Sequence, residues 1–152
     1  EPGPENGPRE WQTLRWTGSE WVRRPLTCSG NNYDHGSLYV ERGGVWRVIG
    51  PTETGPQPCN TGGEVAMWVS RDEGRNWTRT KQLTRASKYN HTFVRRPMNA
   101  HPGFYALWAD GHGREPSMSS LYFTDKEGTQ VWKLPEVMTG ESATPERVSG
   151  GG

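Results

Sequence analysis

Two copies of a tyrosine-Asx-histidine triplet are the residues of this chain best suited to acid–base chemistry. The triplets are Tyr33-Asp34-His35 and Tyr89-Asn90-His91, and their tyrosines lie 89 − 33 = 56 positions apart. A tyrosine or histidine can remove the proton next to the carboxylate of a uronate, and a neighbouring hydrogen-bond donor can hold the resulting charge. The triplet is equally typical of a structural corner in which the Asx side chain caps a turn, so both interpretations stay open.

A polar segment, Asp110-Gly111-His112-Gly113-Arg114-Glu115, adds groups that would serve a second chemistry. Hydrolysis of a glycosidic bond commonly uses two carboxyl groups. The available carboxyl groups in expected loops are Asp34, Glu53, Asp110 and Glu115. No spacing shows which two converge, so the residues identify neither hydrolysis nor elimination. The candidate catalytic residues are His35, Tyr89, His91, Asp110 and His112.

Arginine and tyrosine side chains are the candidates for holding a sugar. Arginine pairs with a carboxylate in a fixed bidentate geometry, which makes Arg114 a candidate for binding an acidic sugar. Tyr33 is a candidate for stacking on a sugar ring. Arg95 and Arg96 are neighbours beside an expected strand, so their side chains should point to opposite faces and at most one should reach a ligand.

Metal-binding patterns are absent from the sequence. The chain has four histidines and two cysteines, Cys28 and Cys59, but neither a His-x₃-His nor a Cys-x₂-Cys spacing. We therefore expect no metal and no other cofactor. The two cysteines could form one disulfide in an oxidising compartment or remain separate thiols, and the sequence leaves both open.

The composition favours an all-β protein. Only 30% of the residues are hydrophobic, and the chain contains 20 glycines and 12 prolines, yet it also contains eight tryptophans. Short strands with frequent turns and aromatic anchors account for this mixture better than disorder does. The 18 basic residues offset 17 acidic ones without a basic block, so we expect no nucleic-acid partner and no membrane partner.

Short alternating or aromatic-rich runs, separated by turn residues, predict a series of strands. Glycines in three of the intervening segments supply the positive φ of tight turns: Thr17-Gly18-Ser19, Arg42-Gly43-Gly44 and Asp72-Glu73-Gly74-Arg75. The predicted strands are residues 11–16, 20–24, 37–41, 45–50, 65–70, 76–83, 92–95, 104–109, 120–124 and 130–134.

A repeat of about 55 residues organises these strands. Trp21, Trp77 and Trp132 each follow a turn, at spacings of 77 − 21 = 56 and 132 − 77 = 55, close to the step between the two triplets. This period suits the four-stranded blade of a β-propeller. The expected parts are a linker or preceding loop (1–9), a partial propeller (10–135) with blade parts 10–24, 36–83 and 91–135, and a flexible tail or truncated start of a next blade (136–152). A ring needs about four to eight blades, so we expect a fragment that the remaining blades of a longer chain complete.

The most specific motif is Ser70-Arg71-Asp72-Glu73-Gly74-Arg75-Asn76-Trp77, which matches the Asp-box pattern S-x-D-x-G-x-x-W. Ser70 and Asp72 can accept hydrogen bonds from N–H groups of the turn. Gly74 permits a left-handed residue, and Trp77 can pack its indole across the base of the hairpin. These four residues are therefore expected to be structural. A degenerate copy begins at Thr124-Asp125, with Asp one position early.

On this motif and the repeat, residues 10–135 resemble the sialidase superfamily of Asp-box (BNR-repeat) propellers. In that family Asp boxes lie far from the active face, which implies a site on the opposite face. The segment from Arg96-Pro97 to Asp110 resembles a sialidase Arg-Ile-Pro segment and implies a substrate-binding role for Arg96. The His, Tyr and Arg content also resembles the propeller polysaccharide lyases.

The resemblance implies a carbohydrate-active protein, either a sialidase-like exo-glycosidase or another glycan hydrolase. Its expected partner is a carbohydrate, including an anionic polysaccharide, and its expected location is extracellular or periplasmic. The alternatives are a lyase that uses Tyr, His and Arg on a uronate, and a glycan-binding or scaffold module without catalysis.

Overall fold

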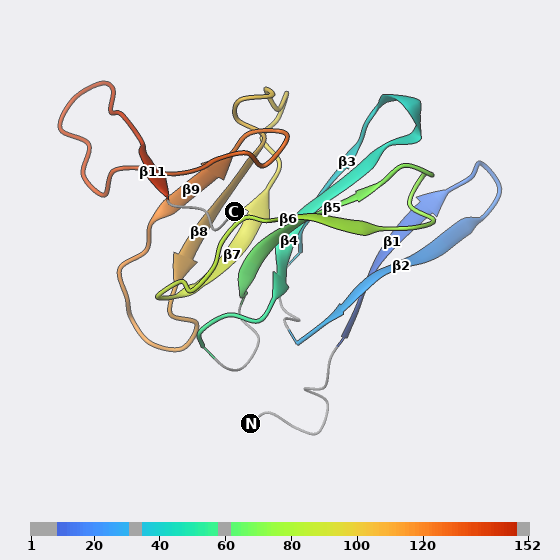
Figure 1. Cartoon of the computed structure of the whole chain (residues 1–152), viewed down its shortest axis with the longest axis horizontal. Helices are drawn as coiled ribbons and strands as arrows, with labels where there is room; N and C mark the ends of the chain where they lie inside the picture. Colours follow the sequence, from blue (N-terminus) through green and yellow to red (C-terminus); the bar gives the residue numbers. More distant parts are fainter. Residues whose placement is uncertain (1–8, 31–34, 58–61, 149–152) are drawn as a thin grey trace.

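The chain is an all-β protein, described here by a computed structural model for residues 9–30, 35–57 and 62–148. Eleven strands in this part of the chain form three separate antiparallel sheets, which Figure 1 shows side by side. The one helical element among the described residues is a short 3-10 turn, η1 (Arg42–Gly44). The sheets fan out from one another and the described strands do not close into a ring, so the propeller itself remains a proposal.

The three sheets follow the order of the chain. Each consists of strands paired with their sequence neighbours. The first sheet contains β1 (Arg9–Trp16) and β2 (Trp21–Ser29). The middle sheet contains β3 (Ser37–Val40), β4 (Trp46–Glu53), β5 (Glu64–Ser70) and β6 (Thr78–Gln82). The third sheet contains β7 (Asn90–Arg95), β8 (Ala106–Gly111), β9 (Leu121–Thr124), β10 (Val131–Lys133) and β11 (Glu146–Val148).

Ten of these strands lie where the sequence pattern predicts them, and the eleventh does not. Strand β11 pairs antiparallel with β10, with Trp132 opposite Arg147. Part of the segment expected to be a tail or the start of a next blade therefore extends the third sheet instead. The sequence Glu146-Arg147-Val148 is too short and polar to show a strand pattern.

The two central strands of the middle sheet are covered on both faces. Every residue of β4 except Glu53, and every residue of β5 except Trp68, is buried. Strand β6, at the sheet edge, is exposed along most of its length. Continuous burial explains why β5 reads as an uninterrupted apolar run, Val65-Ala66-Met67-Trp68-Val69, whereas the partly exposed β1 mixes polar and apolar residues.

The hydrophobic core lies between the middle and third sheets. Its largest fully buried side chains include Tyr39 and Met67 from the middle sheet and Trp108 from the third. Tyr39 stacks on Tyr105 with ring centroids 4.2 Å apart. The core cluster comprises Tyr39, Ile49, Val65, Met67, Val69, Leu83, Val94, Tyr105, Ala106, Trp108, Tyr122 and Val131.

The Asp-box turn joins β5 to β6 and has the hydrogen bonds that its motif predicts. Ser70 Oγ accepts from the N–H of Gly74 at 2.9 Å, and Asp72 Oδ1 accepts from the N–H groups of Arg75 and Asn76 at 3.1 and 2.9 Å. Hydrogen bonds from the Ser70 hydroxyl and from Asn76 lower the pKa of Asp72 to about 2. The indole N–H of Trp77 donates to the Gly74 carbonyl oxygen at 3.1 Å.

The degenerate copy closes the turn between β9 and β10 in a similar way. Asp125 accepts from the N–H groups of Glu127, Thr129 and Gln130 at 2.9 to 3.1 Å. Burial tends to raise the pKa of Asp125, but hydrogen bonds from Thr129 outweigh burial and lower it. In the first sheet, Thr17 Oγ1 accepts from the N–H of Glu20 at 3.2 Å. In three related turns of different sequence, a side-chain oxygen thus accepts hydrogen bonds from the N–H groups of the turn.

In two of these turns, the glutamate that precedes the glycine contacts an arginine of the preceding sheet. Glu73 forms an ion pair with Arg15 of the first sheet. Glu127 lies 3.6 Å from Arg47 of the middle sheet. The repeated turn therefore also supplies a repeated contact between neighbouring sheets, although both glutamates are partly exposed and each pair contributes little stability.

Replacement of Gly74 tests how tightly the Asp-box turn packs. Gly74 has φ +81°, and a Cβ there would lie 2.8 Å from the Trp46 ring. Gly43 has φ +73° but no atom within 4 Å of such a Cβ. We expect Gly43→Ala to lower the free energy of unfolding by about 1–2 kcal/mol through backbone strain alone. Gly74→Ala should cost about 1–3 kcal/mol more because of overpacking, measured by urea denaturation. Equal losses in both variants would contradict this packing.

Candidate functional site

The sheets have two distinct ends. At the Asp-box end lie the turns between β5 and β6 and between β9 and β10. At the opposite end, here called the loop end, β4 leads into β5 and β8 leads into β9, as the pairs Glu53–Glu64 and Ala109–Leu121 show. The loop ends of the middle and third sheets are adjacent because Gly63 and His91 exchange two backbone hydrogen bonds of 2.9 and 2.8 Å.

An open cleft of about 540 Å³ lies at the loop end of the middle sheet. Its walls come from the segment that follows β4, from the start of β5 and from the segment that follows β6. Two carboxylate side chains, Glu53 and Glu64, share the cleft and sit opposite each other in the strand register. The lining residues are Glu53, Thr54, Gly55, Pro56, Glu64, Gln82, Thr84, Arg85, Ala86 and Ser87.

Both carboxylates already have protein partners. Glu53 forms an ion pair with Arg79 and accepts from the Thr52 hydroxyl at 3.1 Å. Glu64 is buried and accepts from the Ser87 N–H at 2.9 Å, from the Ser87 hydroxyl at 2.8 Å and from the Thr84 hydroxyl. Three donors hold the Glu64 carboxylate in place, so its main effect is to fix the loop that follows β6.

His91 extends this network into the core. Its side chain is 3% exposed. Its Nδ1 accepts from the Trp108 indole N–H at 3.0 Å, and its Nε2 lies 2.9 Å from Ser87 Oγ. Because an indole N–H only donates, Nδ1 must be unprotonated and Nε2 must carry the proton of the neutral ring. His91 thus donates to Ser87, which donates to Glu64, and the ring does not open onto solvent.

Burial lowers the pKa of His91, and the nearby Glu64 and Asp110 carboxylates only partly oppose this effect. The Trp108 and Tyr122 rings complete its surroundings, with the Tyr122 centroid 4.9 Å away. A proton on Nδ1 would face the Trp108 N–H, so the packed ring is held neutral. Of the two interpretations of the triplet, the geometry of this copy fits the structural corner.

Asn90 locks the segment after β4 against the start of β7. Its side chain is buried. Asn90 Oδ1 accepts from the Gln57 N–H at 3.1 Å, and Asn90 Nδ2 donates to the Gln57 carbonyl oxygen at 3.2 Å. Gln57 Oε1 accepts in turn from the Asn90 N–H at 2.7 Å. Gly55 lies so close to Asn90 that a Cβ at this position would collide with the amide oxygen.

Tyr89, His112 and Lys88 form the accessible part of the loop end. Tyr89 is half-buried and meets the His112 ring edge-on, with centroids 6.4 Å apart. The Lys88 ammonium lies 5.0 Å from the Tyr89 centroid. Nδ1 of His112 accepts from the backbone N–H groups of Arg114 and Glu115 at 3.3 and 3.1 Å, which shapes the loop. The Arg114 side chain is exposed.

Asp110 lies at the same end but is tied into the third sheet. Its carboxylate accepts from the Ser120 N–H at 2.7 Å and from the Tyr122 hydroxyl at 2.8 Å. Burial and the hydrogen bond to this carboxylate raise the pKa of Tyr122. Asp110 therefore lies near His91 and His112 with both carboxylate oxygens already engaged.

Arg96 does not join these residues. It follows the end of β7 at the Asp-box end, where its guanidinium lies 5.3 Å from the Tyr39 centroid. Because β7 runs from the loop end at Asn90 to the Asp-box end at Arg95, Arg96 lies away from the loop end, and its implied substrate-binding role stays a prediction. Tyr105, which stacks on Tyr39, donates a hydrogen bond from its hydroxyl to Glu41 at 2.9 Å. Burial and this carboxylate raise the pKa of Tyr105 to about 12.

His35 lies apart from the cleft. It is exposed and lines a different cavity, between the first and middle sheets. The backbone carbonyl of His35 accepts from Arg95 at 3.4 Å. Tyr33, Asp34 and Cys59 lie outside the described residues, so the structure does not describe the first triplet as a whole or the Cys28–Cys59 pair.

Of the two cleft carboxylates, Glu53 was among the carboxyl groups considered from the sequence, but Glu64 and its partner Ser87 were not, nor was Gln57 beside the cleft. Glu64, Ser87 and Gln57 carry no motif, and each becomes relevant only through residues about 20 to 35 positions away, as in the Glu64–Ser87 and Gln57–Asn90 bonds. The one available signal was position, because Glu64 and Ser87 flank strands at the expected loop end. Among the described residues, no group of three or more His, Cys, Asp or Glu side chains is placed to hold a metal ion, and no helix has the length and apolar character needed to span a membrane.

The buried His91 predicts a pH-dependent stability. Since its folded-state pKa lies below the ordinary value of 6.5, the folded chain binds fewer protons than the unfolded chain at mildly acidic pH. Stability is complete above about pH 6.5 and falls as the pH drops toward the lowered pKa, by up to about 1.4 kcal/mol per pH unit. Thermal melts between about pH 7 and 5 should show this slope, and His91→Gln should flatten it. His101→Gln, at an exposed loop, is the control and should keep the slope; a flat profile for the unmodified chain would refute the assignment.

Comparisons with known proteins give no relative from which a function could be transferred. No family model, no curated protein and no solved structure matches this chain. The resemblance to Asp-box propellers therefore depends on the motif, the repeat and the sheet arrangement of the chain itself.

Proposed function

We propose that this chain is part of an Asp-box propeller of the sialidase type and that it binds a carbohydrate at the loop end of its sheets. The observation that carries this proposal is the open cleft at the end away from the Asp-box turns. The Tyr89–His112 ring pair lies at the same end of the sheets. Three meandering sheets in chain order, with related turns at one shared end, support the propeller part of the proposal.

The chemistry of the loop end suits a sugar. A sugar presents hydroxyl groups to polar side chains and an apolar ring face to aromatic ones. The cleft offers the Gln82 amide and the Arg85 guanidinium for hydrogen bonding, since the Thr84 and Ser87 hydroxyls already donate to Glu64. Tyr89, the second residue after Ser87, offers an aromatic ring. The site would be preorganised because the Glu64–Ser87 and Asn90–Gln57 hydrogen bonds already hold both walls.

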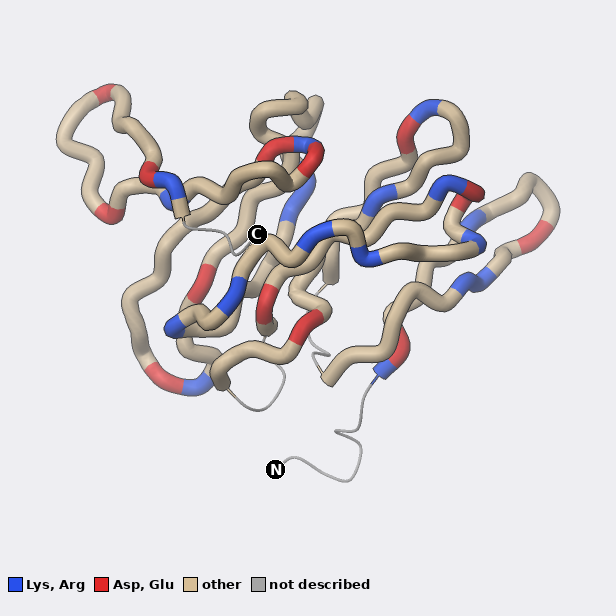
Figure 2. The backbone as a smooth tube through the Cα atoms, in the orientation of Figure 1, with Lys and Arg blue, Asp and Glu red and all other residues tan. Residues whose placement is uncertain are grey.

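The charges favour an acidic sugar. Glu53 is ion-paired with Arg79 and Glu64 accepts hydrogen bonds from Ser87 and Thr84, whereas Arg85 is an exposed cation in the cleft wall. Lys88 and Arg114 add two further exposed cations at this end. Over the molecule as a whole, acidic and basic residues are interspersed without a continuous block of either sign (Figure 2), so any selectivity for anions would be local.

Two reactions compete as extensions of binding. Hydrolysis, as in a glycosidase, would draw on a carboxyl group such as Glu53 or Asp110. Elimination from a uronate would draw on Tyr89 or His112 as the base, with Arg114 or Arg85 near the sugar carboxylate. The engagement of both Asp110 oxygens and of both cleft carboxylates favours binding over hydrolysis. An extracellular or periplasmic location, and completion by the remaining blades of a longer chain, belong to the same proposal.

A binding assay with matched variants tests the proposal. We expect polygalacturonate to bind more tightly than dextran, measured by isothermal titration calorimetry. Tyr89→Ala and Arg85→Ala should each weaken binding about tenfold, equivalent to about 1.4 kcal/mol. Arg42→Ala removes an exposed cation at the Asp-box end and should leave binding unchanged.

The products formed by the chain separate the reactions. New reducing ends without ultraviolet absorbance would indicate hydrolysis, and the absorbance of an unsaturated uronate would indicate elimination. Binding without either product would identify a glycan-binding module. If no polysaccharide binds, or if Arg42→Ala weakens binding as much as Arg85→Ala, the proposed site is wrong.

A further inference from the structure

Strand β1 is incompletely paired in comparison with its counterparts. In the middle sheet, the strand before the Asp-box turn is β5, which pairs with β4 on one side and β6 on the other. In the third sheet, β9 lies between β8 and β10. Strand β1 precedes the corresponding turn of the first sheet, but among the described strands it pairs only with β2. No strand in the described part of the chain pairs with its second edge, here called the open edge.

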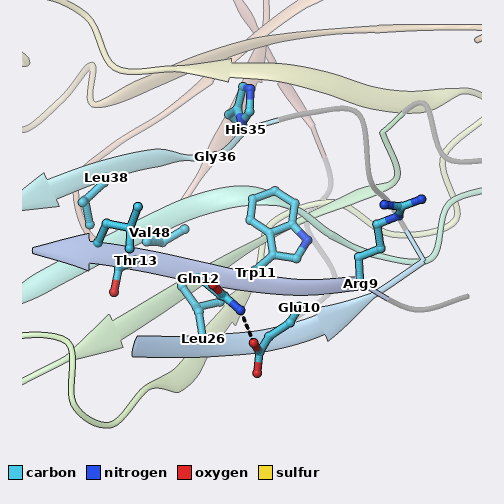
Figure 3. A pocket seen from close by; sticks show the side chains of 11 residues that line it. Arg9, Glu10, Trp11, Gln12, Thr13, Leu26, His35, Gly36, Leu38 and Val48 are labelled. Atoms are coloured by element: carbon cyan, nitrogen blue, oxygen red, sulfur yellow. Dashed lines mark hydrogen bonds between the residues drawn. The ribbon is translucent and has the colours of Figure 1, made fainter. Parts of the chain in front are cut away.

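A groove of about 380 Å³ follows this open edge. Six successive residues of β1, from Arg9 to Leu14, line it together with Leu26, His35, Gly36, Leu38 and Val48. Successive residues of a strand point to opposite faces. Because residues from both faces of β1 line the groove, the groove follows the backbone edge of β1 and not only one face. Figure 3 shows the groove, with Trp11 of β1 on one side and Leu38 and Val48 of the middle sheet on the other.

The walls and surroundings of the groove are largely apolar. Trp11, Leu26, Leu38 and Val48 supply apolar side chains, and Arg9, Glu10 and Gln12 supply polar ones. The face of the first sheet that points away from the middle sheet is also uncovered. On it, Leu14, Trp16 and Trp21 are 61%, 51% and 67% exposed. An uncovered apolar face next to an open strand edge is typical of a surface that another strand covers.

We infer that β1 accepts an antiparallel β-strand, inserted between β1 and β3 and belonging to a hairpin with alternating apolar side chains. The internal repeat specifies this occupant, since β4 and β8 fill the equivalent positions beside β5 and β9, both antiparallel. Main-chain hydrogen bonds to the open edge would supply affinity, and the Trp11–Leu38–Val48 wall would receive the apolar side chains. The inference rests on the proposed propeller, in which such a hairpin comes from the remaining blades.

Amide exchange of the whole ¹⁵N-labelled chain with an added peptide tests the inference. The probe is a peptide of residues 45–53, which covers β4, because main-chain pairing tolerates a related strand sequence. With the peptide at about ten times its Kd, outward-facing β1 amides should exchange about tenfold more slowly, since only the unbound fraction exchanges. A scrambled peptide should have no such effect.

A matched pair of variants locates the contact. Leu38 and Val40 point to the same face of β3 and both are exposed, but only Leu38 lines the groove. Leu38→Arg should abolish the protection of β1, and Val40→Arg should preserve it. Protection at another strand edge, no protection at all, or equal loss in both variants would overturn the inference. Dimerisation of the chain through β1 without peptide would also overturn it, in favour of a second copy as the occupant. Polygalacturonate binding at Tyr89 does not involve this edge, so either result can fail alone.

Discussion

The burial of β4 and β5 on both faces is the constraint on which the rest of the structure depends. A sheet that is apolar on both sides needs a cover on each side, and here the first and third sheets provide it. The packed sheets must also balance the positive charge of Arg47, whose side chain is buried and 5% exposed. Glu41 accepts from Arg47 Nε at 2.9 Å and from Lys126 of the third sheet at 3.0 Å. Arg47 and Lys126 outweigh the effect of burial and lower the pKa of Glu41, so this ion pair fixes the register between neighbouring sheets.

The same stacking creates the loop-end site. Once the middle and third sheets pack, the segment after β4 and the start of β7 must lie together, and Gly63 and His91 pair through their backbones. The chain of hydrogen bonds from Trp108 through His91 and Ser87 to Glu64 then crosses the seam between the sheets. The cleft therefore lies beside a rigid seam, which is the arrangement that a preorganised binding surface needs.

Much of the fold could be predicted from the sequence because its determinants are local. Turn residues and alternation locate ten strands, and the turn at Asp125 folds although its Asp is displaced, because the carboxylate still reaches the N–H groups of Thr129 and Gln130. The candidate site was less predictable. Glu64 and Ser87 belong to no motif, and the placement of Arg96 depends on the direction of β7 and not on the residues around it.

The two triplets show why a repeat does not fix the role of its residues. His91 is buried beside Gly63, which pairs with it through the backbone just before β5, whereas His35, at the equivalent position of the middle sheet, is exposed. The equivalent cover for His35 would be a segment between two strands of the first sheet, at the place where β1 has its open edge. The exposure of His35 and the incomplete pairing of β1 thus have one explanation, since both lie at the groove where the described first sheet has two strands and its neighbour has four. A strand seated beside β1 would bring with it a loop able to cover His35.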